Sequence, residues 1–377
     1  MKLIINASTI YAGGALQVTL SFIDELARMN DNNEYYIFIN RTAQKYFNIN
    51  ILPSNFRVYT IDLSPAKLVT RRKTIGFLNK LECEIMPDIV FSVFGPSYWK
   101  PKSPHVIGVA DGWIYNNKSI AYKNLSLFQF FKRKLLNKYK LYYFRRDSYT
   151  YILETDDACS KFKNIINKEN SKVIKVSNTY NSIYDDFVYD DIPDFLNKIS
   201  IKENDDFFLC YICHNHPNKN LSILKKVAPL LESFNVKFII TLPHDIFERE
   251  FTSFKNIINL GPVHPEECPY IYKYCDALFF PSLLETFTAS YPEAMVMKKP
   301  ILTSDLPFAH DICKDAALYF DPLCPTDIKN KILELKRDSQ LKESLVNNGL
   351  QIISNFPNSK DRAIKYIEIC KETIKNV

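Results

Sequence analysis

Glycine is scarce in this chain of 377 residues, with 8 in all, and two of them are adjacent at Gly13-Gly14. No stretch reaches the roughly 20 uninterrupted apolar residues that a membrane-spanning helix needs, so the sequence predicts none. No G-x-G-x-x-G follows the first apolar run, which argues against an NAD enzyme. The 9 cysteines are an odd number without a framework of spacings. We therefore expect reduced thiols and a cytoplasmic location.

The first residues, MKLIINASTIYAGG, combine one lysine with a short apolar run, as a signal peptide does. Polar Asn6, Ser8 and Thr9 interrupt that run. The segment therefore favours a first buried strand and its turn over a signal peptide.

Charge is divided unevenly along the chain. Residues 1–175 contain 26 Lys and Arg against 14 Asp and Glu, a balance of +12. The totals of 48 basic and 42 acidic residues leave 22 against 28, or −6, for residues 176–377. A basic front half indicates that this half meets an anionic surface.

Short apolar runs alternate with helical patterns from residue 2 to 178, and the alternation restarts at residue 207. This pattern predicts parallel sheets that helices cover on both faces. A polar, Asp-rich stretch between the two series is the predicted linker, at 181–205. We therefore predict an α/β fold of two Rossmann-like domains, 1–180 and 206–355, that face each other across a ligand-binding cleft.

Two carboxylates follow the apolar run DALFFPS. Glu285 and Glu293 are separated by seven residues in the sequence LLETFTASYPEAMVM. We expect Glu285 in a strand-to-helix loop and Glu293 in the first turns of the next helix, so that both face one cleft. The N-terminus of that helix offers free N–H groups and a positive dipole end, which suit a diphosphate. The alternative is two glutamates that cap the helix and face solvent.

The segment PSLLETFTASYPEAMVMKKPILTSD resembles the retaining glycosyltransferases of family 4, also called group 1, which have the GT-B fold. The match covers both glutamates, Phe287 and the Glu-Ala-Met run. The resemblance implies that Glu285 contacts hydroxyls of the donor sugar and Glu293 those of the ribose. Thr286 and Thr288 replace family glycines, and the backbone at Phe287 and Thr288 is expected to hold phosphate.

A second matching piece is CYICHNHPNKNLSIL, at 210–224. Family members carry a basic residue here and a lysine five positions later, and both neutralise the donor diphosphate. Lys219 matches the lysine, and the family's arginine falls on His214, or on His216 if the loop shifts. A histidine is often neutral near pH 7, which weakens this part of the phosphate site. The alternative for Lys219 is a solvated surface lysine.

The same piece spells the haem-attachment pattern C-x-x-C-H, and its histidines are candidate zinc ligands. On a strand, Cys210 and Cys213 point to opposite faces, so we expect structural cysteines. The acidic pairs Asp156-Asp157, Asp185-Asp186, Asp190-Asp191 and Asp205-Asp206 are interpreted as solvated charges. Members of the GT-B fold generally need no metal, and we expect neither a metal nor a cofactor.

In the front domain the resemblance is looser. It covers the strand–glycine–helix start at Gly13 and Gly14, which in the family approaches the donor phosphates and the acceptor. Asp111 follows the run HVIGVA where the family often has a His-Asp pair, and we expect it to contact a donor or acceptor hydroxyl. A plain turn is the alternative at each position. The resemblance also implies that the C-terminal helix, 356–377, crosses back onto the front domain.

Residues 123–146 contain eight basic residues and no acidic residue, interleaved with Leu, Phe and Tyr. Such a stretch suits an anionic membrane surface, and we assign Lys132, Arg133 and Lys134 to this membrane and acceptor side. An ordinary solvated helix face is the alternative. No recognition motif accompanies the charges, so we expect no nucleic-acid partner.

The resemblance implies a metal-independent, retaining glycosyltransferase. It moves a sugar from a nucleotide-sugar donor to a glycan or lipid-linked acceptor, in the synthesis of a surface polysaccharide or glycolipid. The catalytic candidates are Glu285, Lys219 and Asp111. Two alternatives stay open: a sugar-nucleotide 2-epimerase of the same fold, and a non-catalytic sugar-binding protein.

Overall fold

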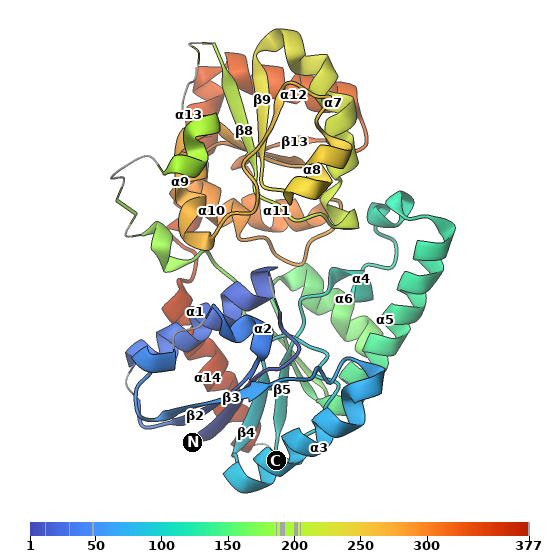
Figure 1. Cartoon of the computed structure of the whole chain (residues 1–377), viewed down its shortest axis with the longest axis vertical. Helices are drawn as coiled ribbons and strands as arrows, with labels where there is room; N and C mark the ends of the chain where they lie inside the picture. The colour runs from blue at the N-terminus through green and yellow to red at the C-terminus, as the bar shows by residue number, and fades with distance from the viewer. Residues whose placement is uncertain are drawn as a thin grey trace. The chain divides into compact units, whose positions relative to one another are not determined.

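The computed structural model describes residues 1–11, 13–29, 31–46, 49–185, 187–188, 193–199, 203 and 205–375. They form two compact units, each with its own sheet (Figure 1). The first unit comprises Met1–Asn117, Leu127–Thr179 and Pro357–Val377, and the second comprises Lys118–Ser126 and Tyr180–Phe356.

The first sheet has seven parallel strands in the order β3-β2-β1-β4-β5-β6-β7. In chain order these strands are β1 (Lys2–Ala7), β2 (Glu34–Asn40), β3 (Phe56–Ile61), β4 (Ile89–Ser92), β5 (His105–Gly108), β6 (Thr150–Leu153) and β7 (Lys172–Lys175). The helices of this unit are α1 (Gly13–Met29), α2 (Arg41–Gln44), α3 (Leu68–Ile85), α4 (Gly112–Tyr115), α5 (Leu127–Asp147), α6 (Asp156–Ile166) and α14 (Ser359–Lys375).

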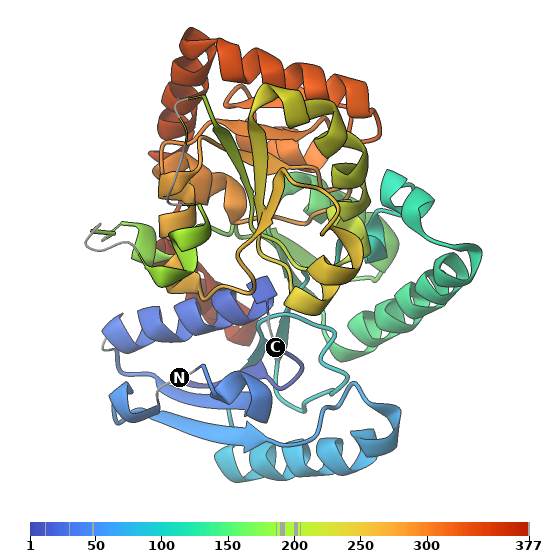
Figure 2. The ribbon, with the colours of Figure 1, turned by 45° about the horizontal axis from the view of Figure 1, so that its top comes forward.

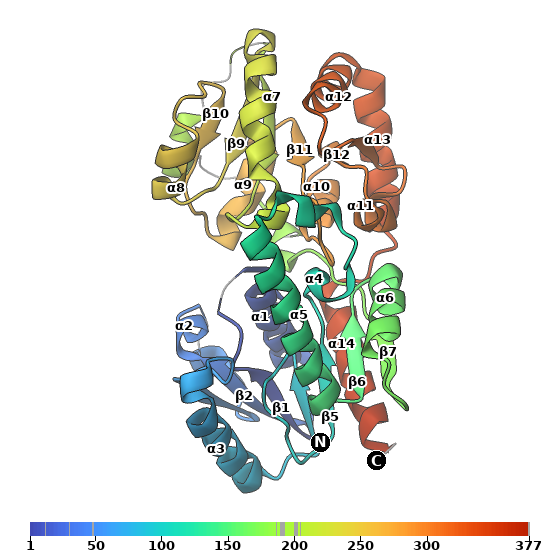
Figure 3. The same ribbon diagram turned by 90° about the vertical axis from the view of Figure 1, so that its right-hand side faces the viewer.

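Alternate residues of the interior strand β1 face different helices, as the two-residue period of a strand requires. Leu3 and Ile5 share a cluster with α1 and α14. Ile4 packs in a separate cluster with Leu78 of α3. Both faces of this strand are therefore apolar, which explains why its sequence is a nearly continuous hydrophobic run. Figure 3 shows α1 and α14 beside the sheet, with α3 on another side of it.

The second sheet has six parallel strands in the order β10-β9-β8-β11-β12-β13. The strands are β8 (Phe207–Tyr211), β9 (Val236–Ile240), β10 (Ile257–Asn259), β11 (Ala277–Phe280), β12 (Ile301–Ser304) and β13 (Ala317–Phe320). The helices are α7 (Leu224–Leu231), α8 (His244–Glu250), α9 (Cys268–Tyr274), α10 (Ser290–Val296), α11 (Pro307–Cys313), α12 (Pro325–Arg337) and α13 (Ser339–Ile353).

Short 3-10 helices complete both units. They are η1 (Ile49–Ile51), η2 (Ile120–Asn124), η3 (Ser182–Tyr184), η4 (Asp194–Lys198), η5 (Pro217–Lys219), η6 (Leu221–Ile223), η7 (Glu232–Phe234) and η8 (Pro265–Glu267). The strands β8 and β11 lie in the middle of their sheet, and every residue of both is buried. The helices α12 and α13, drawn in orange to red in Figure 2, pack against the edge strand β13.

The units differ in two ways from the boundaries that the sequence indicated. Residues 118–126, which we assigned to the front domain, pack with the second unit, where Ala121 and Tyr122 are buried. The described residues of the expected linker, 181–205, also belong to the second unit. They contribute Tyr184, Leu196 and Ile199 to the core of the second unit, which explains why apolar residues occur within this polar stretch.

The C-terminal helix α14 packs on the first unit. Its Tyr366 makes an edge-on contact with Phe22 of α1, with ring centroids 5.2 Å apart. Arg362 is buried and donates to Ser21 Oγ at 2.8 Å, and Ser359 Oγ donates to Glu25 at 2.6 Å. Among the residues that the structure describes, no helix is both long and apolar enough to cross a bilayer.

Candidate functional site

In each sheet there is one point, the switch point, from which successive strands are added outward in opposite directions. In the first sheet this point lies between β1 and β4, and in the second between β8 and β11. Loops that follow the carboxyl ends of strands at such a point are the usual ligand sites of parallel α/β sheets. Gly13 follows β1, Lys219 follows β8 and Glu285 follows β11, so the predicted residues occupy these loops.

Lys219 and Glu285 form the centre of the second unit's loop site. Lys219 Nζ lies 2.7 Å from Glu285 Oε1, and the two side chains are only 19% and 11% exposed. Asn218 Nδ2 donates to the Leu284 carbonyl at 2.6 Å and to Glu285 Oε1 at 3.3 Å. The carboxylate is thus held by a cation and an amide before any ligand arrives, although the two loops lie 66 residues apart in the chain.

Backbone and side-chain contacts fix the position of Lys219. Tyr211, at the end of β8, donates through its hydroxyl to the Lys219 carbonyl at 2.7 Å and lies 3.3 Å from Ser282 Oγ. Asn220 adopts a left-handed conformation, with φ of 52°, and its amide donates to the Pro322 carbonyl at 2.9 Å. The ammonium also lies 5.1 Å from the centroid of the Phe280 ring, which favours a cation.

Phe287 and Thr288 serve the loop in different ways. Phe287 is buried in the core of the second unit and contacts Phe356, with centroids 6.1 Å apart. Thr288 Oγ1 accepts a hydrogen bond from the Ser290 amide at 3.3 Å, at the start of α10. Both side chains turn to the protein, so the backbone of these residues is the part that remains for a ligand.

Glu293 lies in the first turn of α10, with a different set of partners from those of Glu285. Tyr272 of α9 donates to Glu293 Oε2 at 3.0 Å. Burial raises the pKa of Glu293 to about 7, and the hydroxyls of Tyr272 and Tyr184 partly oppose the shift. The carboxyl is therefore divided between its neutral and charged forms near neutral pH.

The two histidines of the segment 210–224 have separate surroundings. Partial burial, followed by the charge of Lys219, lowers the pKa of His214 below its usual value. The lowered pKa favours the neutral form of the His214 imidazole. His216 Nδ1 is hydrogen-bonded to Asn218 Oδ1, so this imidazole helps to hold η5 in place.

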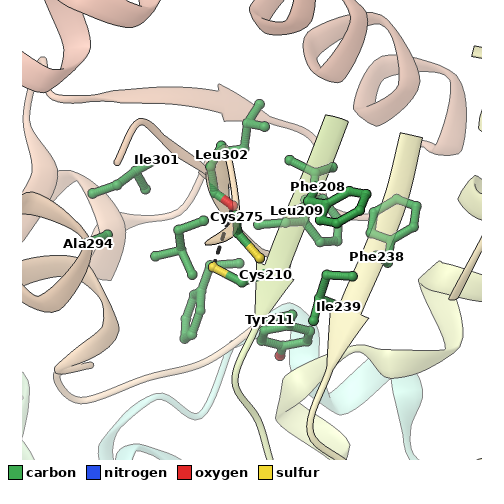
Figure 4. Close-up of a cluster of buried hydrophobic side chains, with 14 of the residues drawn as sticks. Phe208, Leu209, Cys210, Tyr211, Phe238, Ile239, Cys275, Ala294, Ile301 and Leu302 are labelled. Atoms are coloured by element: carbon green, nitrogen blue, oxygen red, sulfur yellow. Dashed lines mark hydrogen bonds between the residues drawn. The ribbon is translucent and has the colours of Figure 1, made fainter. Parts of the chain in front are cut away.

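The cysteines of this segment are structural. Cys210 Sγ donates to the Ala277 carbonyl at 3.5 Å within the core, and Figure 4 shows it beside Cys275 among aliphatic and aromatic side chains. Burial raises the pKa of Cys213 to about 12, so this thiol stays protonated. All 9 cysteines fall on described residues, and each is a free thiol. No group of three or more His, Cys, Asp and Glu side chains suited to a metal occurs in the described ranges.

Four described members of the acidic pairs, Asp156, Asp157, Asp205 and Asp206, have basic partners, whereas Asp185 accepts a hydrogen bond from the Tyr180 hydroxyl at 2.7 Å. Asp157 lies 2.5 Å from Lys161, and Asp206 lies 2.8 Å from Lys237. Three members of these pairs, Asp186, Asp190 and Asp191, lie outside the described residues.

In the first unit, Gly13 and Gly14 begin α1. Gly13 has φ of +71°, a conformation that L side chains rarely adopt, so glycine is required there by the backbone. Within the described part of the chain, nothing lies within 4 Å of a Cβ built at Gly14, where φ is ordinary. The protein itself therefore gives no packing reason for the second glycine.

Asp111 has two partners within the first unit. Its Oδ1 accepts from the Trp113 amide at 3.2 Å and so caps α4. Its Oδ2 lies 2.5 Å from Lys140 Nζ of α5. β5 ends at Gly108, three residues before Asp111, and a Cβ there would lie 1.8 Å from the Val93 carbonyl oxygen, so only glycine fits at this position.

The three predicted membrane-side residues lie on α5, and only one of them points freely outward. Lys132 is exposed. Arg133 lies over the Trp113 ring, 4.9 Å from its centroid, and Lys134 Nζ donates to the Asn117 carbonyl at 3.2 Å.

Residues 193–351 match the family model described as Glycosyl transferases group 1. This part of the chain is similar to that family. The segment contains Lys219, Glu285, Glu293 and the whole second sheet, so the motif resemblance noted in the sequence is confirmed there.

A curated relative extends the comparison by sequence. The chain is 27% identical over 179 residues to the O-antigen chain mannosyltransferase RfbU of Salmonella typhimurium. The match covers 45% of this chain and 46% of the relative, so it spans about half the length of each.

Solved structures extend the comparison to the fold. Anabaena HepE, in complex with UDP and glucose, has a TM-score of 0.71 at 14% identity and covers 99% of this chain and 100% of its own. WaaG, a glycosyltransferase involved in lipopolysaccharide biosynthesis, has a TM-score of 0.71 at 15% identity, with coverage of 98% and 99%. Sucrose-phosphate synthase from Thermosynechococcus elongatus has a TM-score of 0.74 at 11% identity and covers all of both chains. The predicted GT-B fold is confirmed.

Several residues of the site were not assigned a role from the sequence. These are Tyr211, Asn218, Asn220, Tyr272 and Tyr184, each of which holds or faces Lys219, Glu285 or Glu293. Asn218 and Asn220 flank Lys219 in the quoted motif, and two asparagines beside the expected phosphate lysine were the available signal. No sequence signal marked the tyrosines, because their roles depend on which strand and helix lie beside them.

Proposed function

We propose that the chain is a retaining glycosyltransferase that moves a sugar from a nucleotide-sugar to a glycan or lipid-linked acceptor, in the synthesis of a surface polysaccharide or glycolipid. The observation that carries the proposal is the Lys219–Glu285 pair, 2.7 Å apart at the switch point of a group 1 domain. The similarity to an O-antigen mannosyltransferase supports the class of acceptor.

Lys219 has the chemistry that loss of a nucleoside diphosphate requires. Negative charge develops on the leaving phosphate as the anomeric bond breaks, and a fixed ammonium stabilises it. Glu285 then accepts hydrogen bonds from donor-sugar hydroxyls through the carboxylate that Lys219 and Asn218 already orient. Because these contacts to Glu285 are formed before the reaction, the groups need not reorganise during it.

Retention follows in this proposal from the leaving phosphate, which takes the acceptor's proton on the face from which it departs. The pair Lys219 and Glu285 is then a binding pair, unlike the nucleophile and acid of a retaining glycosidase. We propose that no metal and no cofactor takes part. The remaining donor contacts are the backbone at Phe287 and Thr288, the neutral imidazole of His214, and Glu293 at the ribose.

In the first unit, Gly13 and Gly14 are proposed to approach the donor phosphates or the acceptor. The open space around Gly14 supports this role, because a side chain is absent where the protein leaves room for one. Asp111 is the proposed contact for a donor or acceptor hydroxyl, although both of its oxygens already accept hydrogen bonds from the protein.

We propose a cytoplasmic location, peripheral on the inner face of the membrane. The 9 free thiols support it, because a reducing compartment keeps cysteines unpaired.

A thermal-shift screen tests the donor. The purified chain is heated with UDP-, GDP- and CMP-sugars, and the true donor should raise the melting temperature by mass action. Lys219→Ala and Glu293→Gln variants should lose the shift, while Lys225→Ala should keep it. Lys225 is the matched control, because it forms a 2.7 Å pair with Glu250 in the same unit. No shift with any nucleotide-sugar would favour a non-catalytic protein.

Product analysis then separates transfer from epimerisation. With the identified donor and a membrane extract as acceptor, a transferase releases nucleoside diphosphate and labels the acceptor with sugar of unchanged anomeric configuration. A free epimerised sugar without labelled acceptor would identify a 2-epimerase instead.

A further inference from the structure

Helix α5 carries a line of exposed apolar side chains, which we call the α5 stripe. Its members are Leu127, Phe128, Phe131, Leu135 and Tyr142, with exposed fractions of 79%, 76%, 67%, 70% and 58%. Large apolar side chains scattered singly on a surface need no explanation, but a contiguous apolar patch marks an interaction site.

The geometry of the helix gathers these side chains on one face. Phe128, Phe131, Leu135 and Tyr142 follow one another at intervals of three, four and seven residues, which is the spacing of a single face of an α-helix. On the other side, Tyr143 and Phe144 are buried in the first unit. Figure 3 shows α5 as an outer helix of this unit.

Polar contacts hold the helix in this orientation. The buried Asn137 donates to the Trp113 carbonyl at 2.6 Å. Lys140 pairs with Asp111, and Arg145 donates to the Ile165 and Ile166 carbonyls at 2.6 and 2.9 Å. The stripe is thus presented outward by a helix that is fixed along its length.

The charge of α5 identifies the partner. Residues 127–146 contain seven Lys and Arg and no Asp or Glu. Lys132 and Lys138 are exposed close to the stripe, and Lys138 follows Phe131 by seven residues, on the same line. An apolar face with aromatic residues and a basic border fits the boundary between headgroups and acyl chains of an anionic bilayer.

We propose that the α5 stripe inserts into the surface of an anionic membrane, with Lys132 and Lys138 on acidic phospholipid headgroups. A second copy of the chain fits this face less well, because pairing two stripes would bring together two segments that each carry seven positive charges. Lys138 on the line of contact would add to the repulsion.

The stripe also has a consequence for the acceptor, and this part rests on the proposed function. Lys140 of α5 lies 2.5 Å from Asp111, the candidate hydroxyl contact of the first unit. A docked α5 therefore holds Asp111 on the far side of the helix, about one helix diameter (about 10–12 Å) from the bilayer surface, where a lipid-linked acceptor is found. This favours a lipid-linked acceptor over a free glycan.

Co-sedimentation of the full chain with vesicles tests the docking. Vesicles of phosphatidylcholine with 30% phosphatidylglycerol are compared with phosphatidylcholine alone, at about 50 mM and 500 mM salt. The stripe variant is Phe128→Ser with Phe131→Ser and Leu135→Ser. Its matched control replaces three exposed apolar residues of the same unit, Leu68, Val69 and Phe77, by Ser. The charge variant is Lys132→Gln with Lys138→Gln, which leaves the anchoring contacts of Arg133 and Lys134 intact.

We expect the wild type and the control to partition at least tenfold more onto anionic than onto neutral vesicles. The stripe variant should lose at least tenfold of this binding at both salt concentrations, and the charge variant about tenfold at low salt only. Each variant should keep its melting temperature and its thermal shift with nucleoside diphosphate, so a failure of docking is distinguishable from a failure of the donor site.

Two results would overturn the proposal. One is sedimentation of the stripe variant equal to that of the wild type, including the case where neither sediments. The other is a wild-type dimer in analytical ultracentrifugation that the stripe variant converts to monomer, which would show that a second copy covers the stripe.

Discussion

The loops at the two switch points of this protein are built in opposite ways. In the second unit, Lys219 and Glu285 are joined to each other and held by Asn218 and Tyr211, so the polar groups are oriented in advance. In the first unit, the chain after β1 enters α1 through two glycines, and within the described residues nothing lies within 4 Å of a Cβ built at either one. The comparison teaches that one unit holds its polar groups in fixed positions, whereas the other leaves open space beside its backbone.

The largest effect should come from removing the cation of the rigid loop. Lys219→Ala should weaken binding of the nucleoside diphosphate about 10–100-fold, the value of a hydrogen bond to a charged group. The monophosphate should lose less than about threefold, because the charge is aimed at the distal phosphate. Calorimetry with both nucleotides measures the difference, and Lys225→Ala is the control. Equal losses for the two nucleotides would mean that Lys219 acts through folding.

The pH dependence of nucleotide affinity tests whether Glu293 belongs to the same rigid site as Lys219 and Glu285. A ribose hydroxyl donates to a carboxylate better than to a neutral acid, so the affinity ratio of wild type to Glu293→Gln should rise about tenfold from pH 5.5 to 8.5, through the pKa of about 7. The ligand's own titration cancels in this ratio. A ratio that is flat with pH in calorimetry would separate Glu293 from the nucleotide.

The same carboxyl predicts a change in stability. The pKa of Glu293 is raised in the folded protein from its usual 4.5 to about 7. Its contribution to the free energy of unfolding is therefore fully present below pH 4.5 and is lost as the pH rises through 7. The melting temperature of Glu293→Gln should exceed that of the wild type by an amount that grows from pH 5 to 8. The melting temperature of the exposed Glu248→Gln should follow that of the wild type throughout.

Substitutions of Gly13 and Gly14 test the open space at the start of α1. Gly13→Ala should destabilise the first unit by about 1–2 kcal/mol, because φ of +71° is costly for a residue with a Cβ. Gly14→Ala should leave the melting temperature unchanged or slightly higher, since nothing lies within 4 Å of its Cβ. Loss of transfer activity in a stable Gly14→Ala protein would support close approach of a ligand. Full activity would make this glycine part of a plain turn.

The smallest effect is expected at Asp111. Asp111→Asn keeps an oxygen that caps α4 and loses only the ion pair with Lys140, which should cost about 0.5–1 kcal/mol of stability. Asp157→Asn, which breaks a 2.5 Å pair with Lys161 in the same unit, is the control. If Asp111 also contacts a hydroxyl, transfer activity falls far more in the first variant than in the second. Equal activities would leave Asp111 a structural residue.

Much of the architecture follows from local patterns in the sequence. The apolar runs seen from residue 2 to 178 and again from residue 207 supply the strands of both sheets, because buried parallel strands need continuous apolar residues that are visible in the sequence. The motif around Glu285 and Glu293 likewise lies in the segment that matches the group 1 family model, since the spacing of seven residues is a local property.

Other features depended on contacts between distant segments. Residues 118–126 joined the second unit, where Ser119 Oγ donates to the Leu283 carbonyl at 3.3 Å, and no local pattern records a partner 164 residues away. The same holds for Tyr272 beside Glu293 and for Asn218 beside Glu285.

The sequence by itself determined which residue types are present and their local periodicity, and therefore the elements and the motif. Only the tertiary structure decided which charges are satisfied within the protein: Arg133 and Lys134 turn inward on α5, whereas Phe128 and Phe131 face solvent. The physical reason is that a helix period defines faces but does not say which face the rest of the chain will bury.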